Sequence, residues 1–185
     1  MEFKTYSSPH LPVSDSVAAM MQRVLIALLP GIACVTWLFG WGIVINILLA
    51  SLAAVLAEAG ILALRSRSLA ALRDGSALLT GVLLALALPP LAPWWIPVIG
   101  SLFAIVIAKQ LYGGLGYNPF NPAMVGYVVV LISFPVELAH WPGGGAPAAD
   151  TATTLTVFIA GLGAELPDAI SGATPLDEIR IGLAR

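Results

Sequence analysis

Thr174 is a first candidate for chemistry because small residues precede it in the segment DAISGATPLDEI. Gly172 and Ala173 leave its hydroxyl sterically open to a modifying enzyme. A phosphate ester on this hydroxyl would be stabilised at the start of a helix, where backbone N–H groups and the helix dipole favour anions. The same residues also fit an unmodified helix N-cap, because Pro175 suits the first helical position and Asp177 lies three residues after Thr174. The two interpretations are compatible.

Two charged side chains stand in otherwise apolar sequence. Glu58 lies seven residues before Arg65, which is about 10 Å along a helix. Lys109 follows a run of 34 residues without charge. A charge inside a membrane span is costly unless it is paired, hydrated or close to the interface. Glu58 is therefore either an interfacial charge without function, satisfied by snorkelling or by a neighbouring helix, or a residue of a cation or proton pathway.

The remaining reactive side chains predict neither a catalytic nor a metal site. Cys34 is the only cysteine and lies in an apolar run, so it cannot form an internal disulfide or a redox pair, and we expect it to be buried. His10 and His140 show no metal-ligand spacing. The sequence contains no nucleophile–base pair, so any redox chemistry must belong to a bound cofactor. A net charge of −2 offers no basic surface for nucleic acid.

Composition indicates that these residues are carried by membrane helices. The chain has 185 residues, of which 59% are hydrophobic and 10% charged, whereas a soluble domain carries about 25% charged residues. Residues 24–57, 75–108 and 110–136 contain no Asp, Glu, Lys or Arg. A single membrane span needs about 20 apolar residues. The predicted fold class is therefore all-α, a polytopic helical membrane protein.

Turn residues divide the apolar runs into about five spans. Gly40-Trp41-Gly42 indicates a turn at the membrane surface, and Pro89-Pro90 ends a segment that would measure about 21 Å as a helix, shorter than the hydrocarbon core of ~30 Å. That third segment is expected to be broken or half-length. The predicted spans are 22–40, 42–64, 75–88, a fourth that follows Trp95 and ends at Lys109, and 122–135.

The distribution of charge predicts the orientation. Residues 1–110 hold six of the eight Lys and Arg, whereas residues 111–179 hold none and carry six acidic side chains. The positive-inside rule places the N-terminus, the 65–74 loop and Lys109 in the cytoplasm. We expect a cytoplasmic segment over residues 1–21, a transmembrane helical domain over 22–136, and an external segment over 137–185.

The stretch LYGGLGYNPFNP, residues 111–122, is too rich in glycine and proline for a regular helix. It is either a short cytoplasmic loop between spans four and five or an irregular re-entrant segment, which is tolerated at membrane depth only when protein or a cavity surrounds it. In the second interpretation the chain is a channel or secondary transporter fragment with no redox role. A third alternative is a purely structural membrane scaffold.

A family resemblance favours a redox role. Residues 168–174 match the flavinylation pattern acidic-x-x-Ser/Thr-Gly-Ala-Thr, on which flavin transferases attach FMN to the final threonine. Three further stretches are similar to the same family: SSPHLP at 7–12, DGSALLTGVLLALALPP at 74–90 and KQLYGGLGYNPFNPAMVGY at 109–127. Together they resemble the RnfD membrane component of the Rnf ion-translocating ferredoxin:NAD oxidoreductase complex. Its relative is the corresponding membrane component, NqrB, of the sodium-pumping NADH:quinone oxidoreductase.

The resemblance implies FMN bound covalently to Thr174, with Ser171, Gly172 and Ala173 completing the recognition site. It also implies a second flavin, such as riboflavin, between the helices, and electron transfer coupled to Na⁺ or H⁺ movement. The implied partners are a flavin transferase, another flavin subunit, iron–sulfur subunits and the lipid bilayer of the bacterial inner membrane, with Thr174 on the periplasmic side. Family members continue with further spans, so we expect this chain to be the N-terminal half of a larger subunit.

Overall fold

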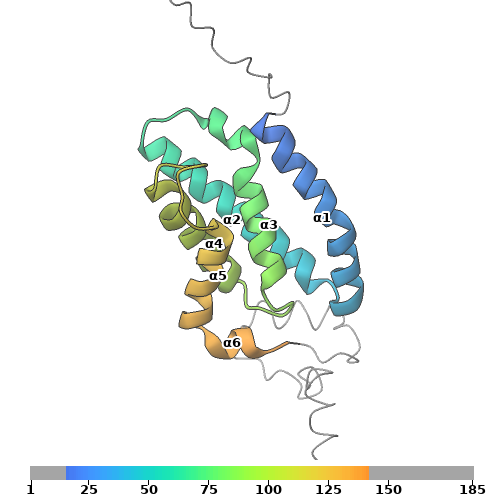
Figure 1. The fold of residues 1–185 in the computed structure, drawn as a ribbon. Helices are drawn as coiled ribbons and strands as arrows, with labels where there is room; N and C mark the ends of the chain where they lie inside the picture. Colours follow the sequence, from blue (N-terminus) through green and yellow to red (C-terminus); the bar gives the residue numbers. More distant parts are fainter. Residues whose placement is uncertain (1–15, 142–185) are drawn as a thin grey trace, which may run out of the picture.

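A computed structural model describes residues 16–141, and the described part of the chain is helical throughout. Residues 1–15 and 142–185 lie outside the described residues. The elements, drawn in Figure 1, are α1 (Val17–Phe39), α2 (Gly42–Leu64), the 3-10 helix η1 (Leu69–Asp74), α3 (Ser76–Ala87), α4 (Trp95–Leu102), the π-helix η2 (Phe103–Leu111), α5 (Pro122–Ser133) and α6 (Pro135–Ala139).

Successive helices run in alternating directions through the bundle (Figure 1). The start of α1 and the 3-10 helix η1 lie at one end, and the α1–α2 turn and α6 lie at the other. α1 and α2 have 23 residues each and are apolar and long enough to cross a membrane. The shorter apolar helices are Ser76–Ala87, Trp95–Leu111 and Pro122–Ser133. The predicted all-helical fold, with its long apolar helices and a half-length helix after residue 75, is confirmed, while its orientation in a membrane stays a prediction.

Local sequence explains where the helices begin and end. α1 begins at Val17, five residues before the expected span, because the Ser16 side chain caps it by accepting a hydrogen bond from the Ala19 N–H at 3.2 Å. α1 ends at Gly40, whose φ of 86° lies in the left-handed region that favours glycine. Asn121 caps α5, and Pro122 occupies its first turn.

α2 is central to the packing and contacts every helix from α1 to η2. Its buried apolar residues include Ile43, Ala50, Ala54 and Leu62. A second apolar cluster joins the end of α3 to α4, α5 and α6 through Leu84, Leu88, Ile96, Val130 and Leu138. The polar residues of the site described below therefore stand on helices that the core fixes in place.

α1 packs only at the edge of the bundle and contributes no fully buried residue. Cys34, on this helix, is exposed. The expectation that this thiol is buried is therefore wrong. A charge-free run predicts apolar surroundings, but it does not say whether protein or lipid supplies them.

α2 and α3 cross at very close range at Gly81. A Cβ atom built on Gly81 would lie 2.6 Å from the Ser51 Cα and 2.7 Å from the Ser51 nitrogen. Real Cβ atoms do not approach backbone atoms so closely, so only glycine allows this crossing. Small residues at a crossing let membrane helices pack through their backbones.

We expect Gly81→Ala to destabilise the protein by about 1–3 kcal/mol, because the added methyl group forces the α2 and α3 backbones apart. The measurement is the unfolding midpoint of the purified protein in detergent. Gly60→Ala in α2 is the matched control, since a Cβ there meets nothing within 4 Å, and alanine is the better helix former by about 1 kcal/mol. Equal midpoints for the two variants would contradict the close crossing.

Candidate functional site

A lysine and a glutamate form an ion pair inside the bundle. The Lys109 Nζ lies 2.6 Å from the Glu58 Oε1, and each side chain is only 2% exposed. Glu58 comes from α2 and Lys109 from η2, 51 residues apart in the chain. Because an unpaired buried charge is strongly destabilising, each of these two charges makes the burial of the other possible.

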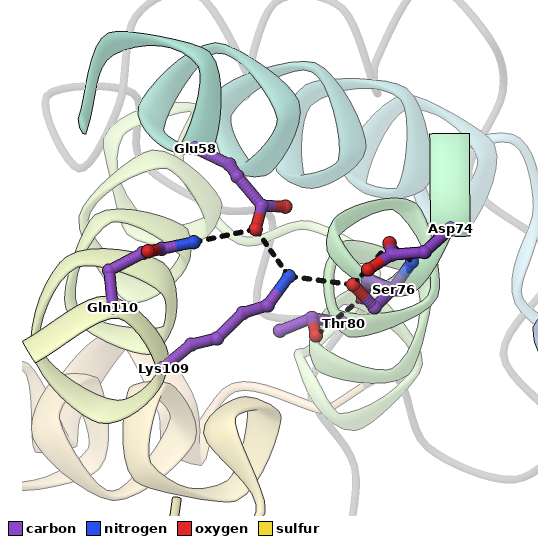
Figure 2. Close-up of polar contacts among 6 residues, drawn as sticks. All are labelled: Glu58, Asp74, Ser76, Thr80, Lys109 and Gln110. Atoms are coloured by element: carbon purple, nitrogen blue, oxygen red, sulfur yellow. Dashed lines mark hydrogen bonds and ion pairs between the residues drawn. The ribbon is translucent and has the colours of Figure 1, made fainter. Parts of the chain in front are cut away.

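Three polar side chains complete the hydrogen bonding around this pair (Figure 2). The Gln110 Nε2 donates to the Glu58 Oε1 at 2.7 Å, and the Lys109 Nζ donates to the Ser76 Oγ at 2.6 Å. The Ser76 hydroxyl in turn donates to the Asp74 Oδ1 at 2.5 Å. The result is one continuous set of hydrogen bonds that joins α2, α3, η2 and the end of η1.

The π-helix η2 supplies two of these side chains from consecutive positions. Lys109 and Gln110 both reach the same carboxylate oxygen of Glu58. Consecutive residues of an α-helix point about 100° apart, so one acceptor rarely receives both. π-helical turns are rare and are frequently found at functional sites. No signal in the sequence predicted this turn.

A tight turn before α3 positions Asp74 and Ser76. Gly75 has a φ of 75°, in the left-handed region, and ends η1 directly before α3. The Asp74 Oδ1 accepts from the backbone N–H of Ser76 at 2.8 Å as well as from its hydroxyl. This local hydrogen bonding is typical of Asp at a turn and fixes the carboxylate beside the first residue of α3.

The second carboxylate oxygen of Glu58 has no hydrogen-bond partner among the described residues. Glu58 Oε2 is buried, as are Ser51 Oγ and Asn46 Oδ1 of the same helix, which also lack partners there. Buried polar atoms are normally satisfied by protein, water or an ion. The carboxylate can therefore accept a further proton, water molecule or cation. Within residues 16–141 no group of three or more His, Cys, Asp and Glu side chains could hold a metal ion.

Arg65, the possible partner of Glu58 along α2, binds elsewhere. Its Nη1 donates to the backbone oxygen of Gln110 at 2.9 Å. A neighbouring helix, through Lys109, satisfies Glu58 instead, which was one of the two expected ways. Glu58 is not a charge exposed at an interface, and the sequence alone did not identify Lys109 as its partner.

Residues 111–122 form a non-helical connection between η2 and α5, and most of them are exposed. Gly113, Gly114 and Gly116 all have positive φ values, which explains why the stretch needs glycine. The Asn118 side chain donates to the Phe120 carbonyl within the loop at 2.8 Å. The loop interpretation of this stretch fits the structure, whereas a re-entrant segment surrounded by protein does not.

The other residues singled out from the sequence are not part of this cluster. Thr174, Ser171, Gly172 and Ala173 lie outside the described residues, as does His10, so the flavin site stays a prediction. The Nδ1 atom of His140 lies 2.6 Å from the Val136 carbonyl oxygen, beside α6.

A bundle of apolar helices around a buried ion pair defines a polytopic membrane protein. Residues 4–184 match the NQR2, RnfD, RnfE family, so the chain belongs to this family. The family resemblance noted from the sequence motifs is confirmed.

Curated relatives extend over nearly the whole chain, and those compared here carry the name of the D component of an ion-translocating oxidoreductase complex. The chain is 50% identical over 195 residues to the relative from Shewanella sediminis, covering 100% of this chain and 56% of that protein. It is 50% identical over 184 residues to the relative from Escherichia coli strain SMS-3-5 (99% of this chain, 51% of the relative) and 52% identical over 182 residues to that of Alcanivorax borkumensis (97% and 52%). The chain thus spans about half the length of these relatives.

We expect Lys109→Met to destabilise the protein by about 3–5 kcal/mol, because it leaves the Glu58 carboxylate buried without its partner. Adding Glu58→Gln to this variant should restore most of the loss, because the double variant buries no charge. The unfolding midpoint in detergent measures both effects. If the double variant loses the sum of the two single losses, the two side chains do not act as a pair.

Proposed function

We propose that this chain is part of the membrane-embedded RnfD component of an Rnf-type ion-translocating oxidoreductase complex. The relatives named for this component support the proposal through about 50% identity over nearly all of this chain. The observation in the structure that supports it best is the buried Glu58–Lys109 pair, because charged pairs inside apolar helices are costly and typical of ion pathways.

The proposed electron carrier is FMN, attached through a phosphoester to Thr174. The support is the match of residues 168–174 to the flavinylation pattern, in which Ser171, Gly172 and Ala173 precede the modified threonine. When bound, FMN would supply the redox chemistry, because no reactive side chain of this sequence can. A second flavin such as riboflavin, a flavin transferase, another flavin subunit and iron–sulfur subunits complete the proposal, in the bacterial inner membrane with Thr174 on the periplasmic side.

We expect the intact mass of the subunit, co-expressed with its flavin transferase, to exceed the sequence mass by one FMN. In-gel flavin fluorescence after denaturation should disappear in Thr174→Ala, because the phosphoester needs this hydroxyl. Thr156→Ala is the matched control, since Thr156 stands in the same segment outside the motif. An unmodified wild-type subunit would contradict the electron-carrier part of the proposal.

The proposed ion path includes the Glu58 carboxylate. Its Oε1 accepts from Lys109 and Gln110, while its Oε2 is buried without a partner among residues 16–141. A carboxylate held in this way can exchange counter-cations without leaving the bundle interior. The coupling of electron transfer to Na⁺ or H⁺ movement would use this exchange.

We expect Glu58→Gln in the assembled complex to lower ion movement per electron by roughly tenfold or more, because the amide cannot compensate a cation and a loss of about 1.4 kcal/mol is already tenfold. Ion uptake into inverted vesicles, driven by the redox substrates, measures it. Glu137→Gln in α6 is the control, because Glu137 is not part of the buried cluster. Unchanged coupling in Glu58→Gln would remove Glu58 from the path.

A further inference from the structure

A directed chain of hydrogen bonds leads from the buried ion pair towards the surface. The Lys109 ammonium donates to the Ser76 Oγ at 2.6 Å, and the Ser76 hydroxyl donates to the Asp74 Oδ1 at 2.5 Å. Lysine has only donors, an ionised aspartate has only acceptors, and serine has one hydrogen to give. The direction of both hydrogen bonds is therefore fixed, and it is the direction in which a proton would leave Lys109 (Figure 2).

Burial decreases along this chain. Lys109 is 2% exposed and Ser76 is 4% exposed, whereas Asp74 is only partly buried and lies at the end of η1. η1 lies at the end of the bundle where α1 begins (Figure 1). Asp74 is thus the member of the chain that can exchange a proton with water.

Thr80 is next to this chain but is not part of it. Its Oγ1 donates to the backbone oxygen of Ser76 at 2.8 Å, so it leaves the Ser76 hydroxyl free to connect Lys109 with Asp74. Thr80 therefore offers a matched control, a buried hydroxyl of the same helix at the same place.

We propose that Ser76 and Asp74 form a proton outlet for Lys109, which operates when a translocated cation takes the place of the ammonium beside Glu58. The proposal rests on the proposed function of Glu58 in the ion path. The cation would approach Glu58 Oε2, the buried oxygen without a partner among the described residues. It would become the counter-charge of the carboxylate, and Lys109 would then no longer be needed in its charged form.

The proton transfer balances in atoms and charge. One N–H bond of Lys109 breaks as a new O–H bond forms on Ser76, while the original O–H bond of Ser76 breaks and an O–H bond forms on Asp74. Lys109 becomes a neutral amine and Asp74 a neutral acid, which then releases the proton to water. When the cation leaves, a proton returns by the same steps in reverse.

The outlet is conditional on the cation because of the burial of Glu58. If Lys109 lost its proton alone, the Glu58 carboxylate would remain as an unpaired charge, 2% exposed, in the bundle interior. Such a state is strongly disfavoured. The other charged side chains at this end are Arg23 on α1 and Arg65, Arg67 and Arg73 between α2 and α3. Their positive charge favours the final release of the proton to water.

The test uses the assembled complex with the full-length subunit, without redox substrates. NaCl is added at constant ionic strength against choline chloride, and proton release is followed with a pH indicator. We expect Na⁺ to release protons from the wild type. Ser76→Ala and Asp74→Asn should slow the release roughly a hundredfold, because each removes a group that transfers the proton. Asn still accepts the hydrogen bond from Ser76 but cannot be protonated there.

Controls separate this role from a structural one. Thr80→Ala should release protons at the wild-type rate, and Ser76→Thr, which keeps a hydroxyl, should recover the rate lost in Ser76→Ala. Deuterated water should slow release in the wild type, and this isotope effect should change in Ser76→Ala. Proton release at the wild-type rate in both Ser76→Ala and Asp74→Asn overturns the outlet, as does a wild type that releases no protons on Na⁺ addition. If these variants behave as the wild type while Glu58→Gln still uncouples ion movement, the outlet fails and the proposed function stands.

Discussion

The contact between the Lys109 ammonium and the Glu58 carboxylate is the interaction on which the arrangement of the site depends. The two residues are 51 positions apart, so the pair exists only when η2 lies against α2. Each charge is stable in the interior because the other is 2.6 Å away. Ser76 and Gln110 then take the positions that the pair leaves open, which makes assembly of the bundle and assembly of the site one event.

Close helix packing holds these groups at hydrogen-bond distance. A Cβ on Gly81 would collide with the α2 backbone, and one on Gly126 would collide with the Gly100 carbonyl oxygen. α2 and α3, and likewise α4 and α5, therefore meet backbone to backbone. Packed interiors are not continuously deformable, so such crossings keep the distances around Lys109 within a narrow range.

The sequence predicted the helices better than the site. Pro89-Pro90 correctly predicted a short third helix, and Gly40 correctly marked the first turn, because these residues act through their own backbone. The pairing of Glu58 with Lys109 could be given only as one alternative, because spacing along a chain does not determine which helices pack together. The π-helical turn has no known local signal, whereas the Asp-Gly-Ser sequence at residues 74–76 could have indicated the turn that links Asp74 to Ser76. The flavin threonine stays a prediction, because residues 142–185 lie outside the described part.

The exposed position of Cys34 has a practical consequence. The sequence contains a single cysteine, and its thiol is exposed on α1, a helix that takes no part in the polar cluster of α2, α3 and η2. A spectroscopic label can therefore be attached to this subunit at one native position without removing any other thiol from it. Such a label would report from the outermost helix on the depth of the bilayer and on the approach of neighbouring subunits.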